Sequence, residues 1–215
     1  MLTVACVLRS GGIYTPEWVE KLQRGVEMHL SHKHRFVCLS DVDVPCQRIA
    51  LEDDWPGWWS KICLWHPAAG LTGPTIYFDL DTLIVGSLDA LAAYPHRFTM
   101  VHEFYRPERM CSTAMAWSGD WSEIWQQMKA DPAAVIAAYD RPRKDKRIGD
   151  QAFIEDCLSG SKIDTFRDLF GETSIASYKV HCKRGIPSGA AAVSFHGRPK
   201  MPAAGGWAQK MWESA

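Results

Sequence analysis

The chain has 215 residues and a formal net charge of −1, with 24 Lys and Arg against 25 Asp and Glu. This length suffices for one domain with a sizeable core, and the balanced charge lacks the basic footprint of a nucleic-acid-binding protein. No apolar run approaches the roughly 20 residues of a transmembrane helix. The first residues also lack the basic leader and cleavage site of a signal peptide, so we expect a cytoplasmic protein. Seven cysteines without paired metal spacing are expected to be reduced and mostly buried.

The first predicted element is a strand at residues 2–8, where a continuous apolar run indicates a central position covered on both faces. The segment Arg9–Gly12 follows its carboxyl end, where open α/β sheets form their ligand crevice. Glycines there let the backbone approach a ligand, with Arg9 as a candidate contact, although a plain turn explains them equally well. A helix is predicted after Thr15 and Pro16, which are typical of a helix start.

A second strand is predicted at residues 36–39 and is followed by an acidic pair, Asp41 and Asp43. A turn containing Asp, with Pro45 close by, explains this pair without a ligand. In the alternative interpretation, Asp41 or Asp43 contacts the ribose or base of a nucleotide. A further short strand is expected at residues 48–51.

Residues 58–65 predict a short helix that carries Lys61. The ammonium of Lys61 is a candidate contact for phosphate or for an acidic cluster, and solvation is the plain alternative.

The strand that begins at Thr75 ends in two carboxylates, Asp79 and Asp81, separated by one residue. Because side chains alternate along a strand, both carboxylates are expected to face the same way. Two close like charges disfavour each other's ionisation unless a cation lies between them. A divalent cation with oxygen ligands, Mn²⁺ or Mg²⁺, suits this arrangement, and a solvated strand end is the alternative.

The second half of the chain predicts strands at residues 97–102 and 111–117, the latter with small residues where a substrate could approach closely. A helix start is predicted at residues 149–154. Asp150 there either complements the helix dipole or, with Gln151, hydrogen-bonds sugar hydroxyls.

Near the C-terminus, a short strand at residues 191–195 leads into His196, Gly197 and, after two further residues, Lys200. A neutral imidazole is a good metal ligand, and the adjoining cations can neutralise phosphate, although a lone histidine at a strand end is often structural. A C-terminal helix at about residues 205–213 is expected to pack on the body of the protein, and packing on a partner or on a membrane surface is the alternative.

Three segments together resemble the bacterial glycosyltransferases of GT-A fold, on the side of the family 8-like glycogenin and lipopolysaccharide galactosyltransferase group. They are YFDLDT at 77–82, GDQAFI at 149–154 and FHGRPK at 195–200. The resemblance runs from the first strand to about Lys200. Two features depart from the group: His196 and Gly197 are adjacent where it has two intervening residues, and its Lys-Pro-Trp is here Lys200-Met201-Pro202.

The resemblance implies a single GT-A domain with a Rossmann-like, mostly parallel mixed sheet, a nucleotide-binding half at about 1–90 and an acceptor-side and metal- and phosphate-binding half at about 91–203. It implies a nucleotide-sugar-dependent transferase that acts with retention, using a carbohydrate or another hydroxyl compound as the acceptor. The metal ligands would be Asp79, Asp81 and His196, with Lys200 on the diphosphate and Asp150 and Gln151 near the acceptor and sugar.

Two alternatives from other classes stay open. Asp79-Leu80-Asp81-Thr82-Leu83 is partly similar to the nucleophile motif of haloacid dehalogenase phosphohydrolases, but lacks its glycine and follows several earlier elements. The other alternative is a non-catalytic nucleotide- or sugar-binding relative that keeps the fold.

Overall fold

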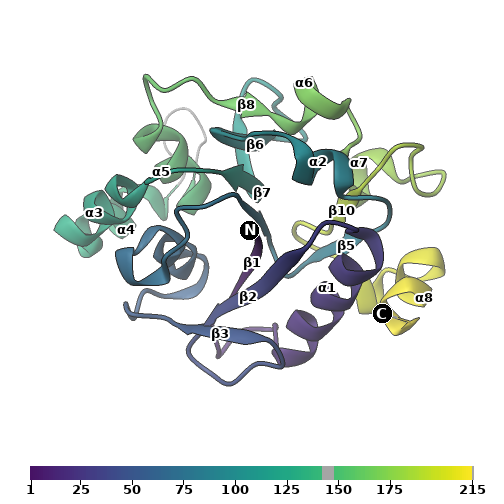
Figure 1. The fold of residues 1–215 in the computed structure, drawn as a ribbon, viewed down its shortest axis with the longest axis horizontal. Coiled ribbons are helices and arrows are strands. Elements are labelled where there is room, and N and C mark those ends of the chain that lie inside the picture. The colour runs from purple at the N-terminus through teal and green to yellow at the C-terminus, as the bar shows by residue number, and fades with distance from the viewer. Residues whose placement is uncertain (142–147, 215) are drawn as a thin grey trace.

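The computed structural model describes residues 1–141 and 148–214, which form an α/β fold around a seven-stranded sheet (Figure 1). Its strand order is β3-β2-β1-β4-β7-β6-β8. Strands β3, β2, β1 and β4 run parallel, β7 is antiparallel to β4 and β6, and β8 is parallel to β6. The sheet is therefore mixed and mostly parallel, as predicted. The strands are β1 Leu2–Leu8, β2 His34–Ser40, β3 Gln47–Ala50, β4 Thr75–Phe78, β6 Phe98–His102, β7 Met110–Trp117 and β8 Asp164–Thr165.

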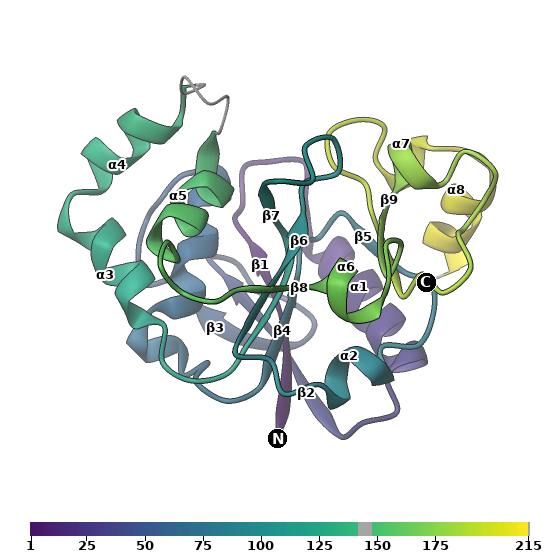
Figure 2. The same ribbon diagram turned by 90° about the horizontal axis from the view of Figure 1, so that it is seen from above.

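Figure 2 shows this sheet between two layers. Alternate residues of β1 enter different cores, because successive side chains of a strand point to opposite faces. Val4 and Cys6 belong to one cluster, and Ala5 belongs to the other. One layer contains η1 Gly57–Trp65, α3 Ser122–Ala130, α4 Pro132–Tyr139 and α5 Gly149–Cys157. The other contains α1 Pro16–His29, α2 Asp89–Ala93, α6 Phe166–Phe170, α7 Tyr178–His181 and α8 Gly206–Ser214.

A second, three-stranded sheet joins distant parts of the chain in the order β5-β10-β9. It consists of β5 Thr82–Ile84, β9 Ile175–Ser177 and β10 Ala192–Ser194. The chain turns between β4 and β5. At this turn the amide of Asp79 donates to the carbonyl of Thr113 (2.9 Å), and the amide of Phe195 donates to the carbonyl of Asp81 (2.8 Å). As a result, the segment after β10 lies beside the Asp79–Asp81 turn.

The C-terminal helix α8 packs on α1, as expected. The ring centroids of Trp18 and Trp212 are 4.4 Å apart, and Lys21 donates a 2.8 Å hydrogen bond to the carbonyl of Trp212. All seven cysteines are free and five are buried. Within the described part of the chain, no helix combines the length and the apolar character needed to cross a membrane.

Candidate active site at the carboxyl ends of β1 and β4

A cavity of about 540 Å³ opens at the carboxyl ends of β1 and β4, the edge at which ligands bind in open α/β sheets. Most of the residues predicted from the sequence line it. They are Arg9, Lys61, Asp79, Asp81, Asp150, Gln151 and His196.

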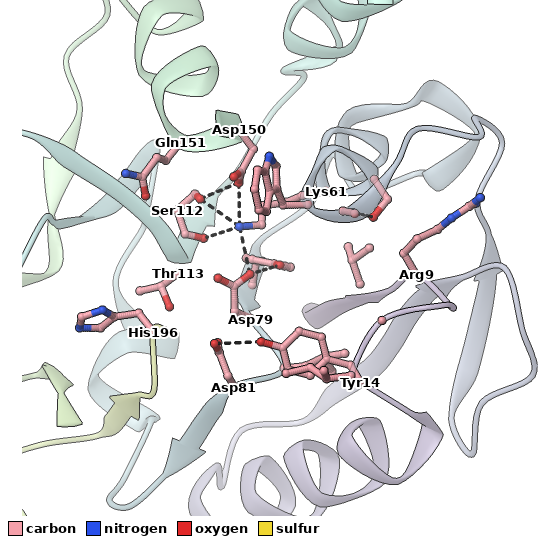
Figure 3. Close-up of a pocket in the computed structure, with 18 of the residues that line it drawn as sticks. Arg9, Tyr14, Lys61, Asp79, Asp81, Ser112, Thr113, Asp150, Gln151 and His196 are labelled. Atoms are coloured by element: carbon pink, nitrogen blue, oxygen red, sulfur yellow. Dashed lines mark hydrogen bonds and ion pairs between the residues drawn. The ribbon is translucent and has the colours of Figure 1, made fainter. Parts of the chain in front are cut away.

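Lys61 lies at the centre of a charged network (Figure 3). Its ammonium is 3.0 Å from Asp79 and 2.8 Å from Asp150, and its side chain is only 7% exposed. The hydroxyl of Ser112 accepts from Lys61 (2.9 Å) and donates to Asp150 (2.8 Å). Tyr77 donates to the other side of this network, at Asp79. Of the open interpretations of Lys61, the structure shows contact with an acidic cluster.

In this network one ammonium group, that of Lys61, lies between two carboxyl groups, those of Asp79 and Asp150, and these charges shift the pKa values of Lys61 and Asp79. Although burial lowers the pKa of Lys61, Asp150 and Asp79 raise it above the usual lysine value, so the ammonium stays charged. Burial, reinforced by Asp81 and Asp150, raises the pKa of Asp79 to about 6 against the opposing effect of Lys61. Because pH 7 lies above this pKa, the Asp79 carboxylate is mainly ionised there and pairs with Lys61.

Asp81 has a different set of partners. The ammonium of Lys200 contacts its carboxylate, and the hydroxyl of Tyr14 donates to it at 3.1 Å. Lys200 also donates to the carbonyl of Phe195 at 3.0 Å. Three carboxylates, of Asp79, Asp81 and Asp150, thus face two ammonium groups, which leaves one excess negative charge.

His196 follows β10 and reaches the cavity edge. Its Nε2 is 2.7 Å from the hydroxyl of Ser177, and its ring stacks on Phe104 with centroids 5.1 Å apart. Burial lowers the pKa of His196, and Lys179 lowers it further against the opposing charge of Asp81, so the imidazole is neutral at pH 7. In Figure 3 the ring points away from Asp81.

Gly197 shapes the loop that follows His196. It has a φ of +69°, a conformation that favours glycine, and an added Cβ would lie 2.7 Å from the ammonium of Lys179. A phosphate contact by Gly197 stays a prediction.

Asp41 anchors the loop after β1. Its carboxylate accepts hydrogen bonds from the amide (2.8 Å) and hydroxyl (2.5 Å) of Ser10. Although burial raises the pKa of Asp41, the Ser10 hydrogen bonds and the charge of Arg9 bring it below its usual value. Arg9 itself pairs with Asp41 at 3.6 Å and with Asp54, and in Figure 3 it extends away from the central carboxylates. The geometry matches the turn interpretation of Asp41, and its contact with a nucleotide stays a prediction.

The predicted metal ligands fit a divalent cation in chemistry but are engaged elsewhere. Among the described residues, no three His, Cys, Asp or Glu side chains gather closely enough to hold a metal ion. Two carboxylates and a neutral imidazole around one cavity are a donor set that suits Mn²⁺, and the excess negative charge favours a cation. In the structure Lys200 and Tyr14 contact Oδ2 of Asp81, and Nε2 of His196 is 2.7 Å from the hydroxyl of Ser177, so these two ligand atoms are engaged by other partners. The metal site therefore stays a prediction.

Several lining residues are not predicted as site residues from the sequence. Tyr14 and Tyr77 hold the two aspartates, and Ser112 connects Lys61 to Asp150. Trp58 and Thr113 also line the cavity. The one available indication was the run of small residues at 111–117.

No protein-family profile and no curated protein matches the sequence. Solved structures are similar in fold. The glycosyltransferase GlyE of Streptococcus pneumoniae TIGR4 has a TM-score of 0.69 at 11% sequence identity. The matched region covers 99% of this chain and 60% of the GlyE chain. This chain thus spans only about three fifths of GlyE.

LgtC, described as a galactosyltransferase, is similar over nearly its whole length. An active-site variant of LgtC with glutamine replaced by glutamate has a TM-score of 0.63 at 10% sequence identity. The matched region covers 99% of this chain and 94% of the LgtC chain. LgtC in complex with donor and acceptor sugar analogues has a TM-score of 0.60 at 10% identity, with the same two coverages. At these identities the comparison establishes the fold: the chain has the GT-A fold and resembles the LgtC-like glycosyltransferases.

Proposed function

We propose that the protein transfers a sugar from a nucleotide-diphosphate sugar to an acceptor hydroxyl. The observation that carries this proposal is the convergence of Asp79 and Asp81, from the end of β4, with Asp150 and Gln151, from the start of α5, in one cavity. The cavity volume of about 540 Å³ is in the range of small-molecule sites. Fold likeness to LgtC, whose complex contains donor and acceptor sugar analogues, supports the same class of reaction.

The donor would lie across the floor of the cavity. Its diphosphate would face Asp79 and Asp81, with the nucleoside extending toward the loop of Arg9–Gly12. Asp79, Asp81 and His196 would hold Mn²⁺ or Mg²⁺, which, when bound, acts as a Lewis acid on the leaving diphosphate. Lys200 lies beside Asp81 and is placed to turn its ammonium toward a phosphate oxygen.

In the transfer step, the bond from the anomeric carbon to the diphosphate oxygen breaks, and the diphosphate leaves with the electron pair. The acceptor oxygen forms the new bond to the anomeric carbon, and its proton passes to an oxygen of the departing diphosphate. Asp150, fixed by Lys61 and Ser112, would stabilise the positive charge that develops on the sugar, and Gln151 would position a hydroxyl. Retention of configuration is proposed on the resemblance alone.

Thermal unfolding with a panel of nucleoside diphosphates, each with and without Mn²⁺, tests the binding part of this proposal. Ligands that bind the native state raise the unfolding midpoint through mass action. We expect one diphosphate to raise the midpoint in a metal-dependent way, and Asp81→Asn to abolish that shift.

Glu27→Gln is the matched control, because it also replaces one carboxylate by an amide, at an exposed position on α1 outside the cavity lining. This variant should keep the shift. A folded wild-type protein that responds to none of the diphosphates, or an Asp81→Asn variant that responds normally, would contradict the proposal.

A further inference from the structure

Trp58 stands apart from the other tryptophans. All ten lie in the described residues, and nine are buried or half-buried, whereas Trp58 is 55% exposed. Leaving a large indole in water forgoes the stabilisation that its burial would give. Trp58 also lines the cavity, so its exposed surface faces a place where a ligand can cover it.

The indole lies beside the two residues proposed to act on the sugar. Gly149, the first residue of α5, directly precedes Asp150 and Gln151. A Cβ built on Gly149 would be 3.3 Å from Nε1 of Trp58 and 3.6 Å from its Cε2, so the indole packs against the bare backbone of this glycine. The absence of a side chain at the first residue of α5 therefore leaves room for the indole next to Asp150 and Gln151.

The cavity is charged at its floor and aromatic at its rim. The Lys61, Asp81 and Asp150 side chains are 7%, 9% and 11% exposed. A nucleotide-diphosphate donor would be held by this floor, which leaves the rim for the acceptor. An exposed indole beside a carboxylate and an amide presents one apolar face and several hydrogen-bonding groups. A pyranose ring has the same division, with C–H bonds on its face and hydroxyls at its edge.

We propose that Trp58 is a specificity-determining residue for the acceptor, on which the C–H face of an acceptor pyranose ring stacks. The acceptor is accordingly a glycoside rather than a simple alcohol or the hydroxyl of a peptide. This inference rests on the proposed transferase function and adds the substrate class of its second site.

Transfer kinetics with saturating donor test the inference. The acceptors are methyl pyranosides and, as ring-free hydroxyl compounds, glycerol and a serine-containing peptide. For Trp58→Ala we expect the KM for the pyranoside to rise on the order of tenfold, as for loss of an aromatic contact. Trp58→Phe should stay within about threefold of wild type, and Trp58→Leu, which keeps apolar area but loses the aromatic face, should resemble Trp58→Ala.

Met28→Ala is the matched control, because Met28 is an exposed apolar residue that lines a different pocket, beside α8. Its pyranoside KM should equal that of the wild type. If Trp58→Ala does not fold, the comparison of Trp58→Phe with Trp58→Leu gives the answer.

The possible failures are distinguishable. If the wild-type protein transfers sugar and the pyranoside KM is unchanged in Trp58→Leu and Trp58→Ala, the inference fails and the proposed function stands. The same holds if the wild-type protein transfers sugar only to ring-free acceptors. A folded wild-type protein that neither binds a nucleoside diphosphate nor transfers a sugar overturns the proposed function, and the inference with it.

Discussion

The ammonium of Lys61 lies 2.8 Å from a carboxylate oxygen of Asp150. Because Lys61 also contacts Asp79, this one side chain connects η1 to the end of β4 and to the start of α5. The two groups that we propose act on the diphosphate and on the sugar are therefore fixed relative to each other by a buried cation.

Replacing this cation should destabilise the fold strongly. Lys61→Met leaves the mostly buried carboxylates of Asp79 and Asp150 without their counterion, and loss of one partner of such a pair costs about 3 kcal/mol. Urea unfolding would measure the loss. Arg24→Met is the control, since Arg24 pairs with Glu20 on the exposed surface of α1, and its effect should stay within about 0.5 kcal/mol. Equal stabilities of the two variants would argue against a structural role for Lys61.

Lys200 is expected to compete with a divalent cation for Asp81. In Lys200→Met the carboxylate of Asp81 loses an ion-pair partner, so Mn²⁺ should bind the nucleotide-free protein about fivefold more tightly. Binding of a nucleoside diphosphate in the presence of Mn²⁺ should weaken. Titration by electron paramagnetic resonance measures free Mn²⁺ directly. Lys33→Met removes an exposed charge elsewhere and serves as the control. Weaker Mn²⁺ binding by Lys200→Met would show that Lys200 does not compete with the cation.

Gly149 is predicted to be intolerant of a side chain. Gly149 and Gly160 both have positive φ, +73° and +89°, so alanine at either position should cost about 1–2 kcal/mol from backbone strain. At Gly149 the added Cβ also meets the indole of Trp58 at 3.3 Å, whereas nothing lies within 4 Å at Gly160. Chemical denaturation should therefore show a larger loss for Gly149→Ala than for Gly160→Ala. A loss for Gly149→Ala that is no larger than for Gly160→Ala would mean that the indole moves aside at no cost.

His96 should make the fold sensitive to acid. Burial lowers the pKa of His96, although its hydrogen bond to the carbonyl of Leu91 (2.9 Å) and the charge of Asp164 act in the opposite direction. Because the folded-state pKa lies below the unfolded value of about 6.5, this contribution to stability is complete above that pH and is lost as the pH falls through the folded-state pKa. The difference in unfolding free energy between wild type and His96→Gln, measured from pH 8 down to pH 5, should shrink or change sign on acidification. A constant difference would contradict this account.

The strand ends were predictable because their signals are local. The apolar run before Asp79 and Asp81 and the helix start at Asp150 are visible in short segments, and in an open α/β sheet such ends converge on one edge. The partner of Lys61 was not predictable in the same way. Its contact with Asp150 depends on η1 packing against β7 and α5, which no local pattern specifies.

The pairing of strands in the three-stranded sheet was not predictable from local patterns either. Thr82–Ile84 pairs with β10, more than 100 residues later, and the sequence alone assigns it no partner. That pairing nevertheless determines where His196 and Lys200 lie relative to Asp81. Ser112 is another example, because one serine in a strand gives no sign that it will connect Lys61 to Asp150.

The measurement that tests the central claim most directly is mass spectrometry of an acceptor panel after incubation with nucleotide sugars and Mn²⁺. The account predicts that one donor adds a single sugar residue to a glycoside acceptor and releases its nucleoside diphosphate. Asp81→Asn should abolish this product, and Glu27→Gln should keep it. Release of inorganic phosphate from a generic ester without sugar transfer, or the same product from Asp81→Asn, would contradict it.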